Sequence, residues 1–302
     1  MEIKELKKIL KEFGDNVRFE YDLKKKNWFN IGGKSKVFYK ANNLKELVSF
    51  LKKLENKEKI FVLGAGSNTL INDSQFDGVV IKLGKNFNNI SLLGENIIIA
   101  GSAVLDKSLS DFAMRNSLSG FEFLSCIPGT IGGGIRMNAG CFKKEFKDIL
   151  LSIQAINQYG NVITIPSENI NFQYRKNDLS DDLIFLSASF KGTKGDSKEI
   201  KCNIDNLKTE KEKNQPTKIK TSGSTFKNPI SQTDKKVWEL IKESVPLNKR
   251  FGDAYISEKH CNFFVNKGNA KFKDMKKLID FVAKNVLEKT GISLEKEIKI
   301  LE

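Results

Sequence analysis

The sequence predicts an α+β protein of three domains. Its 302 residues exceed the length of one typical domain. Strand and helix patterns alternate in the first third, strands dominate the middle third, and a long amphipathic helix leads the last third. Hydrophobic residues make up 39% of the chain, including 22 Phe, which is enough for a sizeable core. The predicted domains are residues 1–76, 77–212 and 213–295.

The first third predicts a small mixed domain. Apolar residues recur at helical spacing over residues 3–13, and a glycine follows as a stop. A second helix is expected over residues 44–54, where Asn43 is placed to cap the first turn. Strand patterns occupy residues 36–41, 60–63 and 79–81.

The middle third predicts a β-rich domain whose informative residues lie in loops. Glycines and turn residues gather between residues 119 and 140. One helix is expected around residues 108–115. Strand patterns occupy residues 97–100, 153–156, 162–165 and 183–190.

The last third predicts an α+β domain behind a polar boundary. Residues 203–214 are almost entirely polar and charged, which is typical of a solvated helix. Residues 271–289 carry an apolar face at helical spacing and end before Gly291. Residues 262–266 form a strand-like run.

The chain is strongly basic, with 51 Lys+Arg against 37 Asp+Glu and a net charge of +14. Such a charge raises the question of nucleic acid as a partner. Only 5 of the 51 basic residues are Arg, however, and Lys does not replace the forked guanidinium in base recognition. We therefore interpret the charge as diffuse and expect no nucleic-acid partner.

Nothing in the sequence indicates a membrane protein or a secreted one. The first 13 residues are charged throughout, and no apolar run approaches the ~18 residues of a membrane span. The 4 cysteines lie far apart and the chain has 1 His, which argues against a zinc site or a disulfide framework. We expect a cytoplasmic protein with neither a metal nor a membrane partner.

A glycine turn, Gly64-Ala65-Gly66-Ser67-Asn68, follows the strand pattern at residues 60–63. It lacks the third glycine of a dinucleotide fingerprint, and no amphipathic helix follows it, so a Rossmann domain is disfavoured. Successive unhindered N–H groups could still hold a diphosphate. A plain tight turn after a core strand is the equally weighted alternative.

A second glycine segment is more specific. It comprises Ile127-Pro128-Gly129-Thr130-Ile131-Gly132-Gly133-Gly134, followed by Met137-Asn138-Ala139-Gly140. Glycines at this density let the backbone approach a flat or anionic ligand, and the missing Gly-Lys-Ser/Thr excludes a P-loop. A flexible linker rarely carries so many large apolar residues, so we favour a ligand-binding loop.

A third segment, residues 221–229, places Ser224 between small residues. Its hydroxyl could be exposed, and Lys227 and Asn228 could bind anionic or amide groups. On spacing alone an ordinary Ser/Thr-rich loop is the favoured interpretation. A Ser-His-Asp hydrolase is weakly supported, because no Gly-x-Ser-x-Gly elbow surrounds the serine.

Taken together, these segments resemble the UDP-N-acetylenolpyruvoylglucosamine reductase (MurB) family. The matching segments run in one order along nearly the whole chain. They are residues 28–33, 64–68, 120–123, 127–133, 137–140, 174–175, 223–229, 256–260, 262–266 and 294–297.

The resemblance implies a PCMH-type FAD-binding fold made by the first two domains, with a third, substrate-binding domain, and it suggests that residues 296–302 return to the first domain. It implies that NADPH reduces FAD, and that the flavin then reduces UDP-N-acetylglucosamine enolpyruvate to UDP-N-acetylmuramate for peptidoglycan. The short segment between Arg175 and Ser224 resembles the class without an extra substrate-covering loop. We expect a monomer.

The resemblance also implies roles for individual residues. Arg175 and Glu297 correspond to the pair that stabilises the intermediate, and Glu297 must be protonated to donate. Ser224 corresponds to the proton donor. The residues expected to bind the flavin are Gly64, Ala65, Gly66, Ser67, Asn68, Ile127, Pro128, Gly129, Thr130, Gly132, Gly133, Asn138, Ala139 and Gly140. The residues expected to contact substrate are Tyr174, Lys227, Asn228 and Lys259.

Alternatives to these roles remain at the level of single residues. Arg175 could be a surface ion-pair residue, and Glu297 alternates with lysines as in a solvated strand. Another FAD-dependent oxidase or reductase of the same architecture is the alternative function. Against the family pattern, Cys126 stands where Gly is usual, Cys141 where a small residue is common, and Lys299 where Arg is frequent.

Overall fold

The computed structural model describes residues 1–216 and 219–302. Helices and strands are mixed, as an α+β class requires. The chain forms two compact units. Unit 1 comprises residues 1–21, 36–65 and 77–211, and unit 2 comprises residues 22–35, 66–76 and 212–302. The division into domains 1–76, 77–212 and 213–295 stays a prediction.

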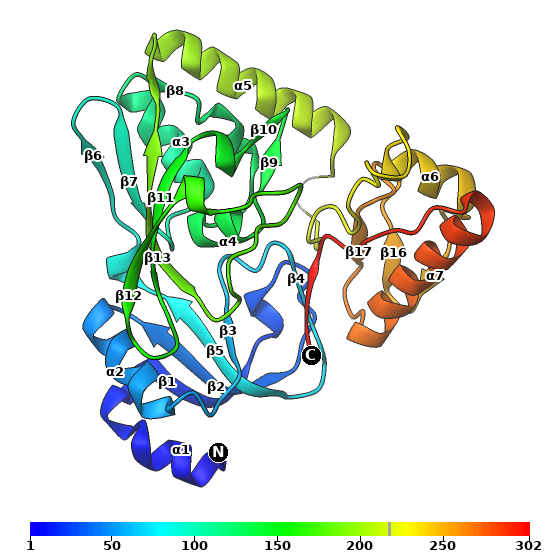
Figure 1. Ribbon diagram of the computed structural model, residues 1–302. Helices are drawn as coiled ribbons and strands as arrows, with labels where there is room; N and C mark the ends of the chain where they lie inside the picture. The colour runs from blue at the N-terminus through cyan, green and yellow to red at the C-terminus, as the bar shows by residue number, and fades with distance from the viewer. Residues whose placement is uncertain (217–218) are drawn as a thin grey trace. The chain divides into compact units, whose positions relative to one another are not determined.

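The first sheet of unit 1 has the order β1-β2-β5-β3 (Figure 1). The inner strand β5 contains three successive β-branched residues that are fully buried, Val79, Val80 and Ile81. Strand β3 pairs with β5 in parallel. Two helices with apolar faces, α1 and α2, complete its core, and the side chain of Asn43 caps α2 as predicted. The bounds are α1 Ile3–Ile9, β1 Val17–Asp22, β2 Lys34–Ala41, α2 Leu44–Leu54, β3 Ile60–Val62 and β5 Phe76–Leu83.

The second sheet of unit 1 is antiparallel with the order β12-β11-β13-β7-β6. The buried face of this sheet packs with α3 and α4 around a core rich in Phe and Ile. The bounds are β6 Ile90–Leu93, β7 Ile97–Gly101, α3 Asp106–Arg115, α4 Ile131–Arg136, β11 Leu150–Ile156, β12 Val162–Pro166 and β13 Ile184–Lys191. Two short ribbons pair β8 Leu118–Ser119 with β14 Thr193–Lys194, and β9 Gly140–Cys141 with β10 Lys144–Glu145.

Unit 2 combines a small antiparallel sheet, β15-β16-β17, with helices α6 and α7, which pack on one another. The apolar face predicted for residues 271–289 is buried in the core of this unit. A separate parallel pair joins β18 to β4, so that the C-terminal residues lie beside residues 69–71. The bounds are β4 Thr69–Ile71, α6 Val237–Ser244, β15 Arg250–Phe251, β16 Ala254–Ile256, β17 Phe264–Asn266, α7 Phe272–Thr290 and β18 Lys299–Leu301.

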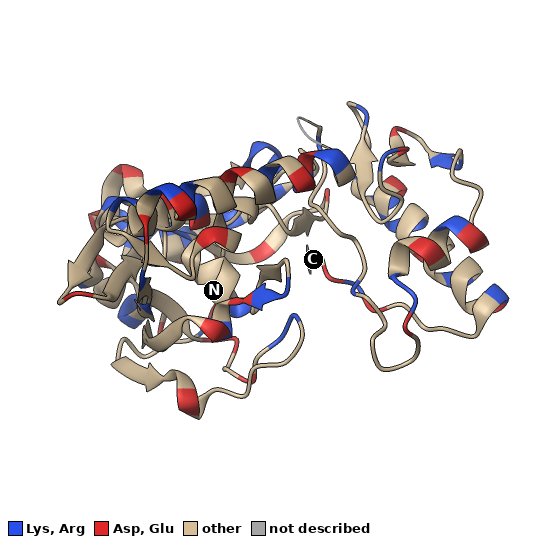
Figure 2. Cartoon of the chain, turned by 90° about the horizontal axis from the view of Figure 1, so that it is seen from above, with Lys and Arg blue, Asp and Glu red and all other residues tan. Residues whose placement is uncertain are grey.

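The polar run before the predicted boundary is the end of α5, Ser197–Asn214. Only two of its residues are buried, so the expectation of a solvated helix is confirmed. Figure 2 shows basic and acidic residues interleaved along the helices, in keeping with a diffuse positive charge. In the part of the chain that the structure describes, no helix is long and apolar enough to cross a membrane. Short 3-10 helices occupy Lys11–Asn16, Lys24–Lys26, Lys85–Phe87, Glu122–Cys126, Phe146–Asp148 and Ser167–Asn169.

Candidate functional site

In unit 1 the first glycine turn meets the second glycine segment. A Cβ on Gly64 would lie 2.5 Å from the hydroxyl oxygen of Thr130, so only glycine permits this approach. The ammonium of Lys82 donates to the carbonyl of Gly64 at 2.7 Å and places positive charge beside the turn. The tertiary structure thus brings together two motifs that the sequence holds more than sixty residues apart.

The turn at residues 64–68 leaves hydrogen-bond donors available. Among residues 1–216 and 219–302, the backbone N–H groups of Ala65, Ser67 and Asn68 donate to no protein acceptor. Gly66 has a φ of +68°, and a Cβ there would lie 2.2 Å from the carbonyl oxygen of Lys26. Glycine is therefore required for the conformation that leaves the neighbouring N–H groups unbonded.

Part of the second glycine segment is helical, although the sequence predicted loops between residues 119 and 140. Ile131–Arg136 forms α4, with three successive glycines inside it. Tertiary contacts outweigh the low helix propensity of glycine here. The N–H of Gly132 donates to the carbonyl of Ser102 at 3.0 Å, and a Cβ on Gly134 would lie 2.3 Å from the ring of Phe146.

A carboxyl group lies buried directly behind this segment. Asp106, in the first turn of α3, is 0% exposed, and its backbone N–H donates to the carbonyl of Gly129 at 3.2 Å. Within the described residues, neither side-chain oxygen of Asp106 has a hydrogen-bond partner. Burial raises the pKa of this carboxyl well above its ordinary value, because nothing nearby compensates its charge. Sequence analysis missed Asp106, and no spacing signal identifies it.

Arg175 lies at the tip of a tight turn. The backbones of Gln173 and Lys176 exchange two hydrogen bonds, of 2.9 and 3.2 Å, and Arg175 has a φ of +57°. This left-handed conformation is unfavourable for a residue that has a Cβ, and it persists where the surrounding structure fixes it. The guanidinium lies over the ring of Tyr174, with 4.9 Å between the guanidinium carbon and the ring centroid.

The guanidinium of Arg175 is directed to the end of the glycine segment. Its Nη2 donates to the carbonyl of Gly140 at 2.7 Å, and Nη1 lies 3.5 Å from the carbonyl of Asn138. The carboxylate of Glu145 lies 3.6 Å from Nη1. Arg175 thus forms an ion pair with Glu145, and this pair is largely shielded from solvent, since the two side chains are 16% and 18% exposed.

Asn138 links the end of the glycine segment to the turn that carries Arg175. It is fully buried with a φ of +40°, and its amide donates to the carboxylate of Glu145 and to the carbonyl of Gln173, both at 3.0 Å. Its side-chain oxygen accepts from the N–H of Lys147 at 3.1 Å. Glu145 was not anticipated, because it stands in a run of lysines with no motif around it.

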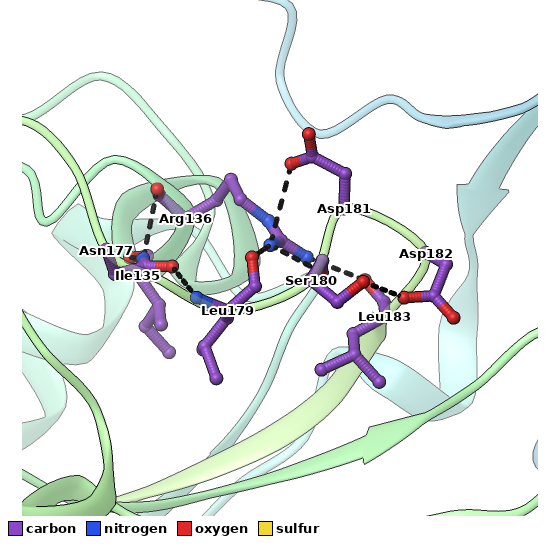
Figure 3. A network of polar contacts seen from close by, with 8 residues as sticks. All are labelled: Ile135, Arg136, Asn177, Leu179, Ser180, Asp181, Asp182 and Leu183. Atoms are coloured by element: carbon purple, nitrogen blue, oxygen red, sulfur yellow. Dashed lines mark hydrogen bonds and ion pairs between the residues drawn. The ribbon is translucent and has the colours of Figure 1, made fainter.

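The loop after Arg175 is held against α4 by a second arginine (Figure 3). Arg136 donates to three main-chain carbonyls, those of Leu179, Ser180 and Leu183, at 3.1, 2.9 and 2.7 Å. Its guanidinium also lies over the ring of Phe185, with 4.3 Å to the centroid. Sequence analysis did not single out Arg136, although it sits between the two halves of the glycine segment.

The amide of Asn177 adds a shorter connection between the same loop and α4 (Figure 3). It donates to the carbonyls of Ile135 and Arg136 at 2.8 and 3.1 Å. The loop that begins at Arg175 is therefore fixed to α4 at several points. We infer that Arg136 and Asn177 position Arg175 through the backbone.

In unit 2, Ser224 and Glu297 belong to neighbouring backbone segments. The N–H of Glu297 donates to the carbonyl of Thr225 at 2.8 Å, and Ser224 forms a β-bridge with Phe263. Asn262 fixes this strand-like segment, because its side chain accepts from the N–H of Phe226 at 3.0 Å and donates to the carbonyl of Phe226 at 2.9 Å.

Asn68, the last residue of the first glycine motif, belongs to unit 2 and contacts the segment of Glu297 within that unit. The amide of Asn68 donates to the carbonyl of Glu297 at 3.1 Å, and the N–H of Lys299 donates to the carbonyl of Asn68 at 2.9 Å. The segment that carries Glu297 is thus ordered by backbone pairing on both sides. The alternation of Glu297 with lysines is also typical of a solvated strand. The hydrogen bonds of this segment show that it is not an isolated one.

The remaining predicted substrate residues lie in unit 2 and have protein partners. Lys227 forms an ion pair with Glu295 at 2.5 Å, and Asn228 accepts from the N–H of Val237, the first residue of α6. Lys259 donates to the carbonyl of Glu212. Burial lowers the pKa of His260, next in the chain, so its imidazole is neutral at physiological pH.

Among the described residues, the predicted site residues belong partly to unit 1 and partly to unit 2. Unit 1 holds Gly64, Ala65, the segment 127–140, Tyr174 and Arg175, and unit 2 holds Gly66, Ser67, Asn68, Ser224, Lys227, Asn228, Lys259 and Glu297. Within residues 1–216 and 219–302 no cluster of His, Cys, Asp or Glu could hold a metal ion.

Two family models match the chain. Residues 35–166 match the FAD binding domain, and residues 215–301 match the C-terminal domain of UDP-N-acetylenolpyruvoylglucosamine reductase. The first range contains the glycine turn, the glycine segment and their buried supports. The second contains Ser224 and Glu297.

Curated relatives and a solved structure extend the match over the whole chain. The chain is 66% identical over 302 residues to the UDP-N-acetylenolpyruvoylglucosamine reductase of Pelagibacter ubique, with 100% of both chains covered. It is 46% identical over 280 residues to the enzyme of that name from Rickettsia typhi, covering 93% of this chain and 94% of that one. The crystal structure of UDP-N-acetylenolpyruvylglucosamine reductase from Thermus caldophilus superposes with a TM-score of 0.80 and 29% identity, covering 95% of this chain and 98% of that one.

Proposed function

Because the chain belongs to the UDP-N-acetylenolpyruvoylglucosamine reductase family, we propose that it uses FAD and NADPH to reduce UDP-N-acetylglucosamine enolpyruvate to UDP-N-acetylmuramate. This places it in peptidoglycan synthesis. The observation that carries the proposal is the pairing in unit 2 that sets Glu297 beside the segment of Ser224, through the 2.8 Å bond from Glu297 N–H to the carbonyl of Thr225.

The residues at the glycine turn fit a bound dinucleotide. The N–H groups of Ala65, Ser67 and Asn68 lack protein acceptors in the described chain, which suits the oxygens of a diphosphate. Gly64 and Thr130 meet without room for a Cβ, so backbone rather than side chain lines this place. We assign FAD to these residues and to the segment 127–140.

When bound, FAD supplies the hydride that reduces the enolpyruvyl double bond. The protein must then stabilise negative charge at the carboxylate end of the substrate and deliver a proton to the other carbon. Arg175 is suited to the first task, because a guanidinium donates through a rigid fork and stays charged. A protonated Glu297 donates a second hydrogen bond to the same developing charge.

Ser224 delivers the proton in this proposal. A hydroxyl is a weak acid, so it can serve only a strongly basic carbon in a tightly held complex. The paired backbone around Thr225 and Asn262 gives such rigidity to the segment that carries Ser224. We assign Lys227, Asn228, Lys259 and Tyr174 to substrate contact, since a diphosphate and a carboxylate call for cations and amides.

The positive charge of the chain suits these ligands. The nucleotide sugar, NADPH and FAD are all anionic, so a net charge of +14 raises their local concentration. We propose that the protein acts as a cytoplasmic monomer. Sedimentation equilibrium of the purified chain tests this, and a concentration-independent dimer would contradict it.

The visible spectrum of the purified protein tests the function. A yellow protein should bleach on anaerobic addition of NADPH and regain its colour on addition of the enolpyruvyl substrate. A colourless protein that cannot be reconstituted with FAD would contradict the proposal. Return of colour with oxygen alone, and no response to the substrate, would indicate an oxidase instead.

A further inference from the structure

One cross-strand pair in unit 1 contacts both arms of the Arg175 guanidinium. In the ribbon of β9 and β10, Glu145 is paired with Gly140. The carbonyl of Gly140 accepts from Nη2 of Arg175 at 2.7 Å, and the carboxylate of Glu145 lies 3.6 Å from Nη1. A guanidinium presents its N–H groups as a rigid fork, so two acceptors held in one place determine the orientation of the whole group.

The absence of a side chain at Gly140 keeps these two acceptors together. A Cβ on Gly140 would lie 2.2 Å from the carbonyl oxygen of Lys144 and 2.8 Å from Cγ of Glu145. The side chain of Glu145 therefore occupies the space that any larger residue at position 140 would fill. The carboxylate and the carbonyl that Arg175 contacts are packed against one another, and neither can shift without the other.

Glu145 is itself held from several sides. Its Oε2 accepts from the amide of Asn138 at 3.0 Å and lies 3.2 Å from the ammonium of Lys147, while Oε1 is the oxygen nearest Arg175. Its backbone N–H donates to the carboxylate of Asp148 at 2.9 Å. Because the side chains of Glu145 and Arg175 are both largely shielded from solvent, their attraction is less screened than that of an exposed pair.

We propose that Glu145 is a positioning residue for Arg175 in the oxidative half-reaction. Its carboxylate and the carbonyl of Gly140 fix the guanidinium in one orientation, so the fork is in place before negative charge develops on the substrate. Donors that are preorganised in this way need no rearrangement as the reaction proceeds. The role rests on the proposed function, because it requires Arg175 to stabilise that charge.

Glu145 acts through Arg175 in this scheme and needs no contact of its own with the substrate. The ion pair with Arg175 offsets the repulsion that a bare carboxylate would exert on an anionic substrate. Misplacing a reacting group by about 1 Å can slow a reaction by about 10²-fold. Removal of Glu145 should therefore matter for the reaction only while the guanidinium of Arg175 is present.

Stopped-flow kinetics of the flavin-loaded Glu145→Gln protein test this role. The carboxylate faces two donors, Asn138 and Arg175, whereas an amide has one oxygen and must turn its own NH₂ group toward one of them. We expect flavin reoxidation by the enolpyruvyl substrate to slow by about 10- to 100-fold, while flavin reduction by NADPH stays within about twofold of wild type. Glu95→Gln, which removes an exposed ion pair with Lys194, is the control and should change neither rate.

A second background separates positioning from a general structural effect. In Arg175→Ala there is no guanidinium to orient, so the additional change Glu145→Gln should not slow flavin reoxidation further. An equal slowing in the wild-type and Arg175→Ala backgrounds would overturn the proposal, because Glu145 would then act independently of Arg175. An unchanged reoxidation rate in the single variant Glu145→Gln would overturn it as well.

An NMR measurement tests the placement of Arg175 without any assumption about the reaction. The chain has 5 Arg, so isotope-labelled arginine gives few Nε–Hε signals, and Arg175→Lys identifies the one from Arg175. In the flavin-loaded wild type the heteronuclear NOE of this signal should match that of ordered backbone, whereas the exposed Arg115 should be more mobile. In Glu145→Gln the Arg175 signal should become as mobile as that of Arg115.

The two measurements keep this role distinct from the proposed function. If the substrate fails to reoxidise the flavin of the wild type, the proposed function fails, and the NMR comparison still decides whether Glu145 holds Arg175. A mobile Arg175 in the wild type overturns the proposal without recourse to any variant that fails to fold. An Arg175 that is as ordered in Glu145→Gln as in the wild type overturns it too.

Discussion

The guanidinium of Arg175 donates to the carbonyl oxygen of Gly140 at 2.7 Å, so a side chain at the tip of one turn is held by the last residue of the glycine segment. The two residues lie 35 positions apart in the sequence. This bond joins the residues assigned to flavin with one assigned to the chemistry.

Arg136→Lys should loosen the loop that leads away from Arg175. A lysine cannot reach the three carbonyls that the guanidinium serves, and hydrogen bonds from a charged donor are worth about 1.5–3 kcal/mol each. We expect a loss of about 3 kcal/mol in urea unfolding, together with a fall in kcat. Arg115→Lys, on an exposed arginine that bonds within its own helix, is the control and should change little.

Gly134→Ala and Gly133→Ala are a matched pair in one helix. A Cβ at Gly134 would lie 2.3 Å from the ring of Phe146, whereas at Gly133 the nearest atom, the hydroxyl oxygen of Thr130, lies at 3.6 Å. Overpacking should cost the first variant about 1–3 kcal/mol, while the second should gain up to about 1 kcal/mol from helix propensity. Urea unfolding of the flavin-free proteins measures both, and equal stabilities would contradict the packing.

Ser224→Ala should separate the two half-reactions. Flavin reduction by NADPH should stay within about twofold of wild type, while flavin reoxidation by substrate should slow by about 10²–10⁴-fold, the usual contribution of a positioned proton donor. Stopped-flow absorbance records each half-reaction. Ser231→Ala, on an exposed serine nearby in the sequence, is the control. Equal loss in both half-reactions would indicate a folding defect instead.

Glu297→Gln should be milder than Glu297→Ala. The amide keeps a hydrogen-bond donor where a protonated carboxyl is proposed, and alanine keeps none. In the oxidative half-reaction we expect Glu297→Gln to be at least about tenfold more active than Glu297→Ala. The reason is that the loss of one donor to developing charge costs about 10²–10³-fold. Indistinguishable rates would count against a protonated Glu297.

Asp106→Asn should change how stability depends on pH. Below the ordinary aspartate pKa of 3.8, both folded and unfolded chains hold the proton, and this group contributes no pH dependence. As the pH rises past 3.8, the unfolded chain releases the proton and the folded chain keeps it, because burial raises the pKa. Wild type therefore loses stability relative to Asp106→Asn, by up to about 1.4 kcal/mol per pH unit, until the folded pKa is reached.

Urea unfolding of wild type and Asp106→Asn across this range checks that prediction. The difference between the two profiles isolates Asp106 from the other carboxylates. Asp111→Asn, on the same helix α3, is the control. Wild-type and Asp106→Asn profiles that run parallel would show that the carboxyl ionises in the folded state as readily as in the unfolded one.

Periodicity predicted most of the elements that carry a core. The helix over 271–289 and the strands near 79–81, 97–100 and 183–190 are present, because burying one face demands a regular repeat that the sequence displays. Short elements such as α4 and β18 were not anticipated. The glycines of α4 oppose helix formation on their own, and only contacts such as those of Gly132 with Ser102 make the helix stable.

The candidate site, too, was predicted from the sequence in part and revealed by the structure in part. Ordered motifs along the chain pointed to the family, and the comparisons confirm it. The motifs did not reveal three of the groups that support them: Asp106, Arg136 and Glu145. Asp106 meets Gly129, Arg136 meets residues 179–183 and Glu145 meets Arg175, and in each case the two positions lie more than twenty residues apart, so no local pattern marks these groups.

Residue type at short spacing was enough to predict the α+β class and the glycine segments, and the order of the motifs along the chain pointed to the family. The meeting of Gly64 with Thr130 and the bond from Arg175 to Gly140 could be seen only in the folded chain. These two contacts join residues that lie 66 and 35 positions apart. They form because burial and hydrogen bonding are satisfied over the whole unit at once, which no window of the sequence contains.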